Sequence, residues 1–507
     1  MSEATPGQVL PTLIARRLRL LSQHDAIVLM REDSPVCRSE GHAPRSQVLL
    51  LANGREVTAT LYQVGRDDIV QPDEAGLSEA AWARLGVSDG QEIQVRHSPA
   101  LTSMSSVRRR VFGARLDAAA LRDIISDVAA GRYTDVHLSA FLTACSALPM
   151  DLEEVVHLTR SMVQVGDRLS WDHPVVIDKH SVGGLPGNRT TPLVVAIVAA
   201  NGLVIPKTSS RAITSPAGTA DTMETLTNVD LNLAAMRRVV EQEGGCLAWG
   251  GAVRLSPADD VLIRVERVLD IDTEGQLVAS VLSKKIAAGS THVVLDIPVG
   301  PTAKVRSQED ADAIAKVLTA VAQRCGLSVR CVQTDGGQPV GRGIGPALEA
   351  RDVLAVFRGA PDAPADLRRR ACLLAGAALE LAGRCAPGEG EQLAEQTLTD
   401  GRAWAKFQRI CEAQGGLREP PRSTVSRPVL AARSGRLIAM NNRTLGRLAK
   451  LAGAPDDKAA GVELHARLGD EIAAGEVLLT VHADAPGALA YALDYAAANS
   501  GLLTIEA

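Results

Sequence analysis

Short apolar runs alternate with helical patterns between about residues 174 and 360, and this alternation limits the possible folds more than any other feature. A helix is expected from about residue 191 to 200. Four runs are typical of buried strands: residues 175–177, 203–205, 293–297 and 328–332. Strands that alternate with helices build a parallel sheet with helices on its faces. We therefore predict an α/β domain in the middle of the chain.

The beginning of the chain carries a different pattern. Residues 26–30 and 47–51 are short apolar runs broken by turn residues, and residues 85–95 form a turn followed by an alternating strand. Such runs are typical of short β-strands. They predict a small β-barrel over about the first hundred residues.

A helical pattern begins at Leu116, and β-rich patterns return after about residue 420. Asp117, Asp135 and Asp151 stand where three helix N-caps are expected. Residues 461–464 and 477–481 are strand-like again. We predict an α/β multidomain fold with four parts: a β-rich, barrel-like extension over 1–100, a helical domain over 101–173 completed by part of 220–290, an α/β domain over 174–420 and a β-rich domain over 421–507.

The composition disfavours several classes of protein. The net charge of -5 gives no basic excess for a nucleic-acid backbone, and aromatic residues at 2% offer few surfaces for base stacking. The most apolar run, residues 193–200, is too short to span a bilayer, and the first residues lack a signal-peptide pattern. The 8 cysteines include no Cys-x-x-Cys pair, so we expect no metal site and a reduced, cytoplasmic protein.

The first cluster with chemical character spans residues 178–191, where a predicted strand passes into a predicted helix. It contains Lys179, Ser181, Thr191 and three glycines. Glycine allows close approach of the backbone to a ligand, and the amides at a helix N-terminus attract anions. These features predict a phosphate-binding loop, with a tight turn and a threonine cap as the alternative. The spacing does not match the Gly-x-x-x-x-Gly-Lys-[Ser/Thr] motif.

The second cluster, residues 207–224, follows the next predicted strand. It combines many hydroxyl side chains with Arg211 and Gly218. Ligands of open α/β sheets bind at the carboxyl ends of the strands, so we expect both clusters to face one crevice. An ordinary loop rich in serine and threonine is the alternative.

Two further patterns are weaker. Lys284 and Lys285 follow Ser280 on a predicted helix, and a lysine pair of this kind usually lies on a solvated helix face. Residues 341–346 (Gly-Arg-Gly-Ile-Gly-Pro) depart from the Gly-x-Gly-x-x-Gly fingerprint of dinucleotide-binding proteins. A structural turn is therefore expected there, which counts against a dinucleotide-binding oxidoreductase.

The first two clusters resemble the thymidine phosphorylase family, in the branch that also includes AMP phosphorylase. The family's Lys-His-Ser-x-Gly-Gly loop matches residues 179–184, and its Ser-x-Arg…Gly-Thr-x-Asp-x-x-Glu signature matches residues 209–211 and 218–224. Its helical Ser-x-x-x-Lys motif matches Ser280 and Lys284. The similarity covers about residues 110–507, and motifs of this length are specific. The first hundred residues resemble an extension carried by enzymes like AMP phosphorylase.

The resemblance implies roles for individual residues. The expected phosphate contacts are Lys179, Ser181, Gly184, Thr191, Ser209 and Thr219. The expected nucleoside or nucleotide contacts are Ser210, Arg211, Ala212, Ile213, Thr214, Ser215, Ser280, Lys284 and Lys304. One position departs from the family, because Val265 stands where thymidine phosphorylases read the pyrimidine with an arginine.

The resemblance also implies an activity, the phosphorolysis of an N-glycosidic bond by a pentosyltransferase. Phosphate would attack the anomeric carbon of the sugar in a cleft between the helical and α/β domains. Asp272 matches the proton donor of the AMP phosphorylase branch and is the first candidate for the acid, with His180 as the second. The C-terminal domain is expected to be α/β hammerhead-like, and the assembly a homodimer or larger homo-oligomer. No cofactor is expected, since phosphate is a substrate.

Two substrate classes stay open within this activity. Thymidine or a related nucleoside is one, and AMP, giving adenine and ribose 1,5-bisphosphate, is the other. A noncatalytic scaffold is a third interpretation, suggested by the β-rich segments at both ends. The joint presence of Lys179, Ser181, Thr219 and Asp272 counts against it. No nucleic-acid or membrane partner is expected.

Overall fold

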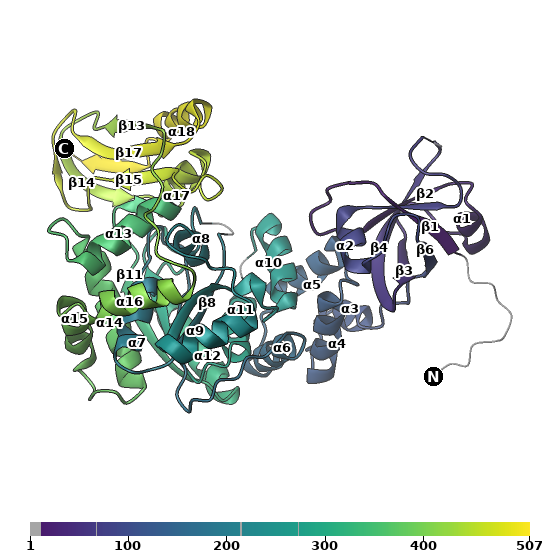
Figure 1. Cartoon of the computed structure of the whole chain (residues 1–507), viewed down its shortest axis with the longest axis horizontal. Coiled ribbons are helices and arrows are strands. Elements are labelled where there is room, and N and C mark those ends of the chain that lie inside the picture. Colours follow the sequence, from purple (N-terminus) through teal and green to yellow (C-terminus); the bar gives the residue numbers. More distant parts are fainter. Residues whose placement is uncertain (1–11, 67, 213–214, 272, 507) are drawn as a thin grey trace. The chain divides into compact units, whose positions relative to one another are not determined.

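The computed structural model describes residues 12–66, 68–212, 215–271 and 273–506 (Figure 1). The backbone divides into two compact units, each described here by itself. The first contains Met1–Ala114 and Ser126–Phe141, and the second contains Arg115–Ile125 and Leu142–Ala507. Among the described helices, none combines the length and the apolar character needed to span a membrane.

Six strands of the first unit form a closed barrel, in the order β1-β5-β2-β4-β3-β6. Burial alternates along the strands, so that Val48 and Leu50 of β3 are fully buried while their neighbours are partly exposed. Every second side chain therefore fills the interior, as the two-residue period of a strand requires. The elements are β1 (Thr12–Arg17), β2 (Ile27–Arg31), α1 (Pro35–Glu40), β3 (Gln47–Ala52), β4 (Arg55–Val64), β5 (Glu74–Leu77), α2 (Glu79–Leu85), β6 (Glu92–His97) and α3 (Met104–Val111).

The helices that follow begin near the predicted caps. They are α4 (Ala118–Ala129), α5 (Asp135–Ala147) and α6 (Leu152–Gln164). Asp117 accepts a hydrogen bond from the amide of Ala120 at 2.8 Å, which confirms the predicted cap of α4. The prediction for Asp135 is wrong by one residue, because Asp135 is the first residue of the helix and Thr134 precedes it.

The start of α6 is held by a capping box. Asp151 Oδ1 accepts from the amide of Glu154 at 2.9 Å, and Glu154 Oε2 accepts from the amide of Asp151 at 3.0 Å. The two bonds satisfy amides that have no partner inside the helix. Two later helices, α10 (Pro257–Leu269) and α11 (Glu274–Ala287), pack against α6.

Parallel strands form the centre of the second unit, which confirms the α/β prediction. Three strands pair in the order β11-β10-β7, and β8 pairs with β9. A parallel bridge between Val176 and Val204 joins the two groups. The carboxyl ends of β7 and β8 therefore lie at one edge. The strands are β7 (Ile177–Ser181), β8 (Ile205–Ser209), β9 (Gly245–Trp249), β10 (His292–Val299) and β11 (Ser328–Asp335).

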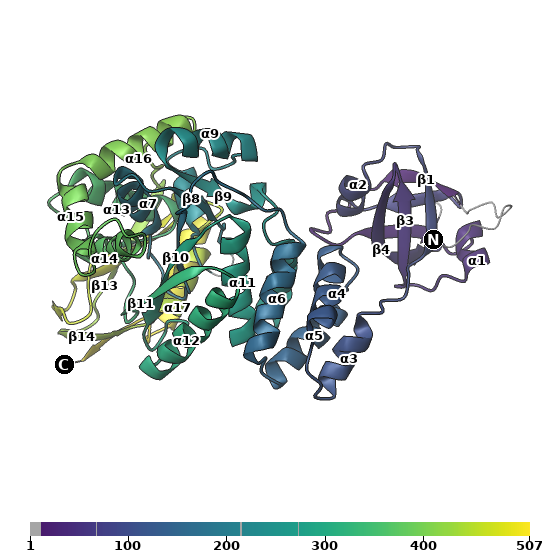
Figure 2. The ribbon, with the colours of Figure 1, turned by 90° about the horizontal axis from the view of Figure 1, so that it is seen from below.

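Helices cover both faces of this sheet because β10 is apolar on both sides (Figure 2). Val294 packs into a core with α7 and α14, whereas Val293 and Leu295 pack into a second core with α11 and α12. Since α7 is enclosed in the first core, it is apolar all round. The remaining elements are α7 (Thr191–Ala200), α8 (Thr219–Glu224), α9 (Leu233–Glu243), the 3-10 turn η1 (Gly250–Ala252), α12 (Gln308–Arg324), α13 (Pro346–Arg358), α14 (Ala365–Leu381), α15 (Gly390–Thr399) and α16 (Arg402–Ala413).

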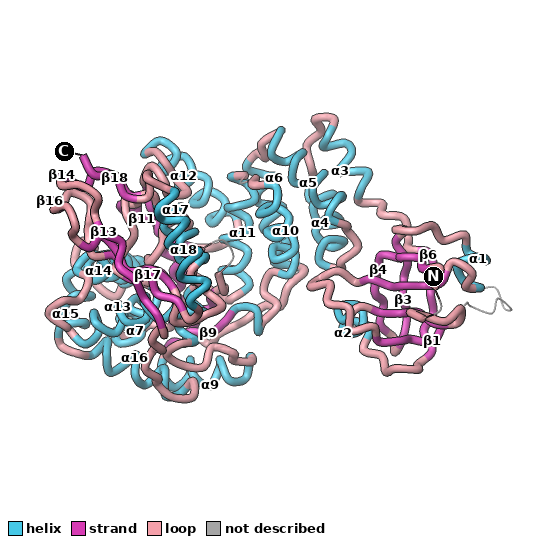
Figure 3. Tube along the Cα trace, turned by 90° about the horizontal axis from the view of Figure 1, so that it is seen from above, coloured by secondary structure: helices cyan, strands magenta, loops and turns pink. Residues whose placement is uncertain are grey.

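The last part of the chain forms two small sheets that pack with two helices (Figure 3). The strand orders are β12-β15-β17-β13 and β16-β14-β18, and the runs predicted at residues 461–464 and 477–481 are β15 and β17. The elements are β12 (Gly343–Ile344), β13 (Val425–Leu430), β14 (Gly435–Met440), α17 (Asn442–Leu451), β15 (Gly461–Leu464), β16 (Glu471–Ile472), β17 (Val477–Ala483), α18 (Pro486–Ala498) and β18 (Leu503–Glu506).

The glycine motif at residues 341–346 forms a turn and the short strand β12. Asp352 of α13 accepts hydrogen bonds from the amides of Arg342 and Gly343, both at 2.7 Å. Gly345 has a φ of 132°, and a Cβ there would lie 2.4 Å from the carbonyl oxygen of Ala460. The glycines therefore serve close packing of the backbone, as expected for a structural turn.

We expect Asp151→Ala to weaken the start of α6, because the variant loses the side-chain acceptor for the amide of Glu154, one of the two bonds of the capping box. The loss of such a cap costs about 1 kcal/mol. Amide hydrogen exchange in the first turn of α6 should accelerate by roughly fivefold. Asp123→Ala, at an exposed position of α4, is the control and should leave exchange in α6 unchanged. Equal exchange in the Asp151 variant and the wild type would contradict the assigned cap.

Candidate functional site

The predicted phosphate loop joins the carboxyl end of β7 to α7. The parallel register places Asp296 of β10 opposite Ser181. Asn188 of the loop donates to Asp296 Oδ2 at 3.0 Å and to Ser181 Oγ at 3.3 Å. The loop therefore folds back against the ends of two strands.

Lys179 is buried at the base of this loop. Its Nζ donates to Thr190 Oγ1 at 2.9 Å and lies 4.0 Å from Asp296 Oδ2. Burial lowers the pKa of Lys179 to about 8; the Asp296 carboxylate opposes this shift, and the charges of Arg189 and Arg370 add to it. The ammonium group is thus still charged at neutral pH, but the Asp296 carboxylate at 4.0 Å neutralises this charge only in part. Such a group stabilises a bound anion.

Two glycines of the loop are required by close backbone contacts. Gly184 has a φ of 81°, and a Cβ there would lie 2.4 Å from the amide nitrogen of Lys304. Gly187 has a φ of 76°, and its Cβ would lie 2.2 Å from the carbonyl oxygen of Val340. The structure therefore brings together Gly184 and Lys304, which are 120 positions apart in the numbering. The resemblance assigned both residues to ligand contacts.

The predicted phosphate-binding hydroxyls come from four elements, with Ser181 at the end of β7. Ser209 ends β8, and within the described ranges its buried hydroxyl makes no hydrogen bond. Thr219 begins α8, and its hydroxyl accepts from Arg189 Nη1 at 2.8 Å. Thr191 is buried at the first position of α7. A buried hydroxyl without a partner costs free energy, so Ser209 is suited to bind a ligand oxygen.

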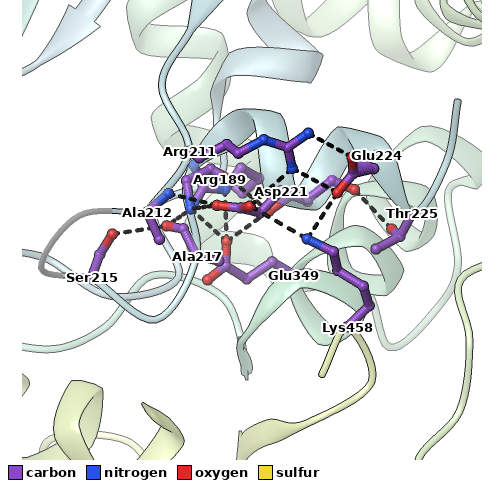
Figure 4. Close-up of polar contacts among 12 residues, drawn as sticks. Arg189, Arg211, Ala212, Ser215, Ala217, Asp221, Glu224, Thr225, Glu349 and Lys458 are labelled. Atoms are coloured by element: carbon purple, nitrogen blue, oxygen red, sulfur yellow. Dashed lines mark hydrogen bonds and ion pairs between the residues drawn. The ribbon is translucent and has the colours of Figure 1, made fainter. Parts of the chain in front are cut away.

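Arg211 of the second cluster is engaged by carboxylates (Figure 4). Its two Nη atoms each donate to an Oε of Glu224 at 2.7 Å, and its guanidinium lies 4.8 Å from the ring centre of Trp249. Lys458, from the loop between α17 and β15, adds a contact with Glu224 at 2.8 Å. The hydrogen bond from Arg211 is the main reason that the pKa of Glu224 falls to about 2. The charge of Arg211 is therefore already matched within the protein.

Asp221 fastens both ends of the segment that follows Arg211. Its Oδ2 accepts from the amide of Ala212 at 2.6 Å and from the amide of Gly218 at 2.9 Å. Within this segment, Ser215 Oγ donates to the carbonyl of Ala217 at 3.0 Å. Ser210 precedes it and is exposed. Ile213 and Thr214, also predicted contacts, lie outside the described residues.

The predicted base-reading residues lie on α11. Ser280 is half-buried, and Lys284 Nζ pairs with Asp259 of α10 at 2.5 Å. Lys285 is buried and pairs with Asp178 Oδ2 at 2.7 Å. The usual interpretation of a lysine pair as a solvated helix face is therefore wrong here. Both lysines have carboxylate partners that lie far from them in the sequence.

The structure describes only one of the two candidate acids. Asp272 lies outside the described residues. His180 lies on β7, where burial holds its pKa well below the usual value and the charges of Lys285, Lys207, Lys284 and Lys179 lower it further. The imidazole is therefore neutral at pH 7 and is a poor proton donor in this environment.

Three family models match this chain, and they follow the architecture described above. The glycosyl transferase family a/b domain matches residues 173–404, the helical bundle domain of that family matches residues 105–166, and the pyrimidine nucleoside phosphorylase C-terminal domain matches residues 437–502. A "Putative thymidine phosphorylase" of Chelativorans sp. strain BNC1 is 66% identical over 100% of this chain and 99% of the relative. The chain belongs to this thymidine phosphorylase family. A protein of the same name from Tolumonas auensis is 61% identical over 98% of both chains.

Solved structures of other enzymes share the fold of part of this chain. Anthranilate phosphoribosyltransferase from Thermus thermophilus aligns with a TM-score of 0.51 and 20% identity over 61% of this chain and 99% of that one. The enzyme from Saccharomyces cerevisiae, solved with PRPP and Mg, aligns with a TM-score of 0.50 and 17% identity over 62% and 98%. At this identity the likeness concerns the fold of the shared domains alone.

One pair at the candidate site of this family member was missed by the sequence analysis. Arg189 forms a buried ion pair with Glu349 Oε2 at 2.6 Å and donates to the carbonyl of Ala217 at 2.9 Å. Glu349 also accepts from Thr222 Oγ1 and from the amide of Gly345, both at 3.2 Å. Arg189 lies inside the predicted loop, but no sequence signal connects it with a residue 160 positions away.

We expect Arg189→Gln to destabilise the protein, because it leaves the Glu349 carboxylate buried without its partner. Breaking a buried ion pair in this way costs about 3–5 kcal/mol. Urea unfolding followed by tryptophan fluorescence measures the loss. The double variant Arg189→Gln/Glu349→Gln should recover much of it, since no buried charge is left unpaired.

Arg324→Gln provides the control for this experiment. Arg324 pairs with Glu153 at 2.7 Å, but both side chains are about half exposed. Exposed pairs contribute about 0–1 kcal/mol, so the control should unfold almost as the wild type does. If Arg189→Gln changed the stability as little as this control does, the ion pair between Arg189 and Glu349 would not be important for stability.

Proposed function

We propose that this protein is a phosphorylase of the thymidine phosphorylase type. It uses inorganic phosphate to split the N-glycosidic bond of thymidine or a related nucleoside, and it releases the free base and (deoxy)ribose 1-phosphate. The observation that carries the proposal is Lys179, a buried and poorly compensated ammonium group at the carboxyl end of the central sheet. The relatives named for this activity match the chain over its full length.

Phosphate would bind at the loop after β7. Lys179 supplies the charge, and the hydroxyls of Ser181, Thr191, Ser209 and Thr219 supply hydrogen bonds. Gly184 lets the loop pack directly against the backbone of Lys304, which holds the loop in place for the phosphate. The unpaired hydroxyl of Ser209 supports this assignment, because a phosphate oxygen would satisfy it. Fixed donors of this kind position the attacking oxygen at the anomeric carbon.

The base would lie near α11, read by Ser280 and Lys284. As the glycosidic bond breaks, the sugar gains oxocarbenium character and the departing base needs a proton. Asp272 remains the proposed donor, by resemblance. His180 has little support for this role, since burial, with the charges of the surrounding lysines, keeps its imidazole neutral. Positioned proton transfer contributes roughly 10²–10⁴-fold to such a reaction.

AMP is not favoured as the substrate. Its 5′-phosphate would need additional cationic or hydroxyl contacts, and Arg211 is one of the residues that the resemblance assigns to nucleotide contacts. Arg211 is paired through both Nη atoms with Glu224, and Asp221 lies 3.5 Å away. An additional phosphate would have to compete with these two carboxylates.

Several sequence predictions belong to the same proposal. Substrates would bind in a cleft between the helical elements and the α/β sheet, and the C-terminal part would be α/β hammerhead-like. The division at residues 100, 173 and 420, a homodimer or larger assembly, a cytoplasmic location and the lack of a cofactor also stay predictions.

The activity is tested by incubating the protein with thymidine, uridine or AMP, each with and without phosphate. We expect release of the pyrimidine base only when phosphate is present, together with a sugar 1-phosphate. Little or no adenine should be released from AMP. Base release that is independent of phosphate would identify a hydrolase instead.

Lys179→Ala tests the phosphate site. The variant loses a charge-assisted contact worth about 1.5–3 kcal/mol, so phosphate affinity should fall by at least roughly tenfold. Isothermal titration calorimetry with inorganic phosphate measures this directly. Lys406→Ala is the matched control, because Lys406 pairs with Glu243 on helices α16 and α9 away from the sheet edge. Equal affinity in the wild type and the Lys179 variant would overturn the site.

A further inference from the structure

Five charged side chains are buried together beneath the proposed phosphate site. They are Lys179, Lys207, Lys285, Asp178 and Asp296, each at most 4% exposed. We call this set the lysine cluster. Three ammonium groups face two carboxylates, so the fully ionised cluster carries one surplus positive charge. Burial makes such a surplus costly unless an anion compensates it or a proton leaves.

Asp178 is the one carboxylate shared by two of the three ammonium groups. Its Oδ2 lies 2.7 Å from Lys285 Nζ, and its Oδ1 lies 3.0 Å from Lys207 Nζ. Burial alone would raise the pKa of Asp178, but the charges and hydrogen bonds of the two lysines hold it below its usual value. One carboxylate therefore serves two ammonium groups and cannot compensate both.

The other described groups around Lys285 supply no further negative charge. Lys207 of β8 repels it, and Cys246 of β9, beside Lys207 and Asp178, has its pKa raised by burial to about 12 and stays neutral. His180 of β7 is neutral as well. On α11 itself, Lys284 takes the carboxylate of Asp259. Among the ion pairs of the described residues, Lys285 pairs with Asp178 alone.

Lys285 is the group that gives up its charge most readily. Burial lowers its pKa to about 7; the carboxylate of Asp178 opposes this, and the charge of Lys207 adds to it. Near neutral pH, loss of this proton leaves Lys207 and Asp178 as a balanced pair. An anion bound at Lys179 would reverse the preference, because a nearby opposite charge favours the ionised lysine.

We propose that phosphate binding is coupled to the uptake of a proton, and that Lys285 receives it. The proton comes from solvent onto Nζ, forms no bond with phosphate and returns to solvent when the anion leaves. This inference rests on the proposed function, which places phosphate at Lys179. Since binding then consumes a proton, phosphate affinity falls as the pH rises above neutrality.

The experiment is calorimetry with inorganic phosphate at about pH 7.5, in two buffers that differ in their enthalpy of protonation. The difference in binding enthalpy between the buffers gives the number of protons exchanged. Phosphate and Lys179 also titrate in this range, and both are still present in a Lys285 variant. The comparison therefore isolates Lys285.

We expect Lys285→Met to take up about half a proton less than the wild type while it still binds phosphate. Its affinity should also vary less between about pH 6.5 and 8.5. Lys406→Met is the control and should exchange protons as the wild type does. Equal proton uptake in the wild type and Lys285→Met would overturn the inference.

Lys285→Met should fold, because Asp178 keeps Lys207 as its partner and no net charge is buried. If thermal melting shows that it does not, Lys285→Arg is used, since arginine keeps its proton throughout this pH range. Lys285→Arg should then show the same reduction in proton uptake as expected for Lys285→Met. A wild type that binds no phosphate at all would refute the proposed function and this inference with it, whereas binding with unchanged uptake refutes the inference alone.

Discussion

The buried ion pair between Arg189 and Glu349 holds the candidate site together. Arg189 reaches Thr219 and the carbonyl of Ala217, so it joins the phosphate loop to the start of α8. Glu349 reaches the amide of Gly345, next to the strand β12. Three segments that are distant in sequence therefore depend on one salt bridge. Because both groups are buried, neither can be lost without leaving a charge that water cannot reach.

Local features of the chain could be predicted from the sequence. The apolar runs at residues 293–297 and 328–332 lie within β10 and β11, because such runs need burial on both faces of a sheet. The runs at 175–177 and 203–205 only lead into β7 and β8, which continue into the predicted polar clusters. Asp117 and Asp151 were identified as caps, since a capping side chain bonds only to amides two or three residues away. The segment 179–191 was recognised because its lysine, glycines and hydroxyls lie close together in the sequence, although Lys179 and Ser181 belong to β7 and the glycines lie in the loop after it.

The pairings between distant residues could not be predicted. Lys284 and Lys285 suggested a solvated face, because a single sequence does not show which carboxylate will lie opposite a lysine. The partner of Lys285 is 107 positions away, and it becomes a neighbour only when α11 packs near β7. The contact of Lys458 with Glu224 depends in the same way on how the C-terminal part folds. Burial and charge compensation at the site are thus properties of the tertiary structure.

The strand β12 has a consequence for how this protein can be divided. It lies between the central sheet and α13 in the chain, yet it completes a C-terminal sheet by pairing with β15. The amide of Ala347 also bonds to the carbonyl of Lys458. A cut at residue 420 would remove the partner of β12 and leave β15 as an open edge. The C-terminal part is therefore not an independent module that could be exchanged at a linker, because its sheet is complete only with the segment that leads into α13.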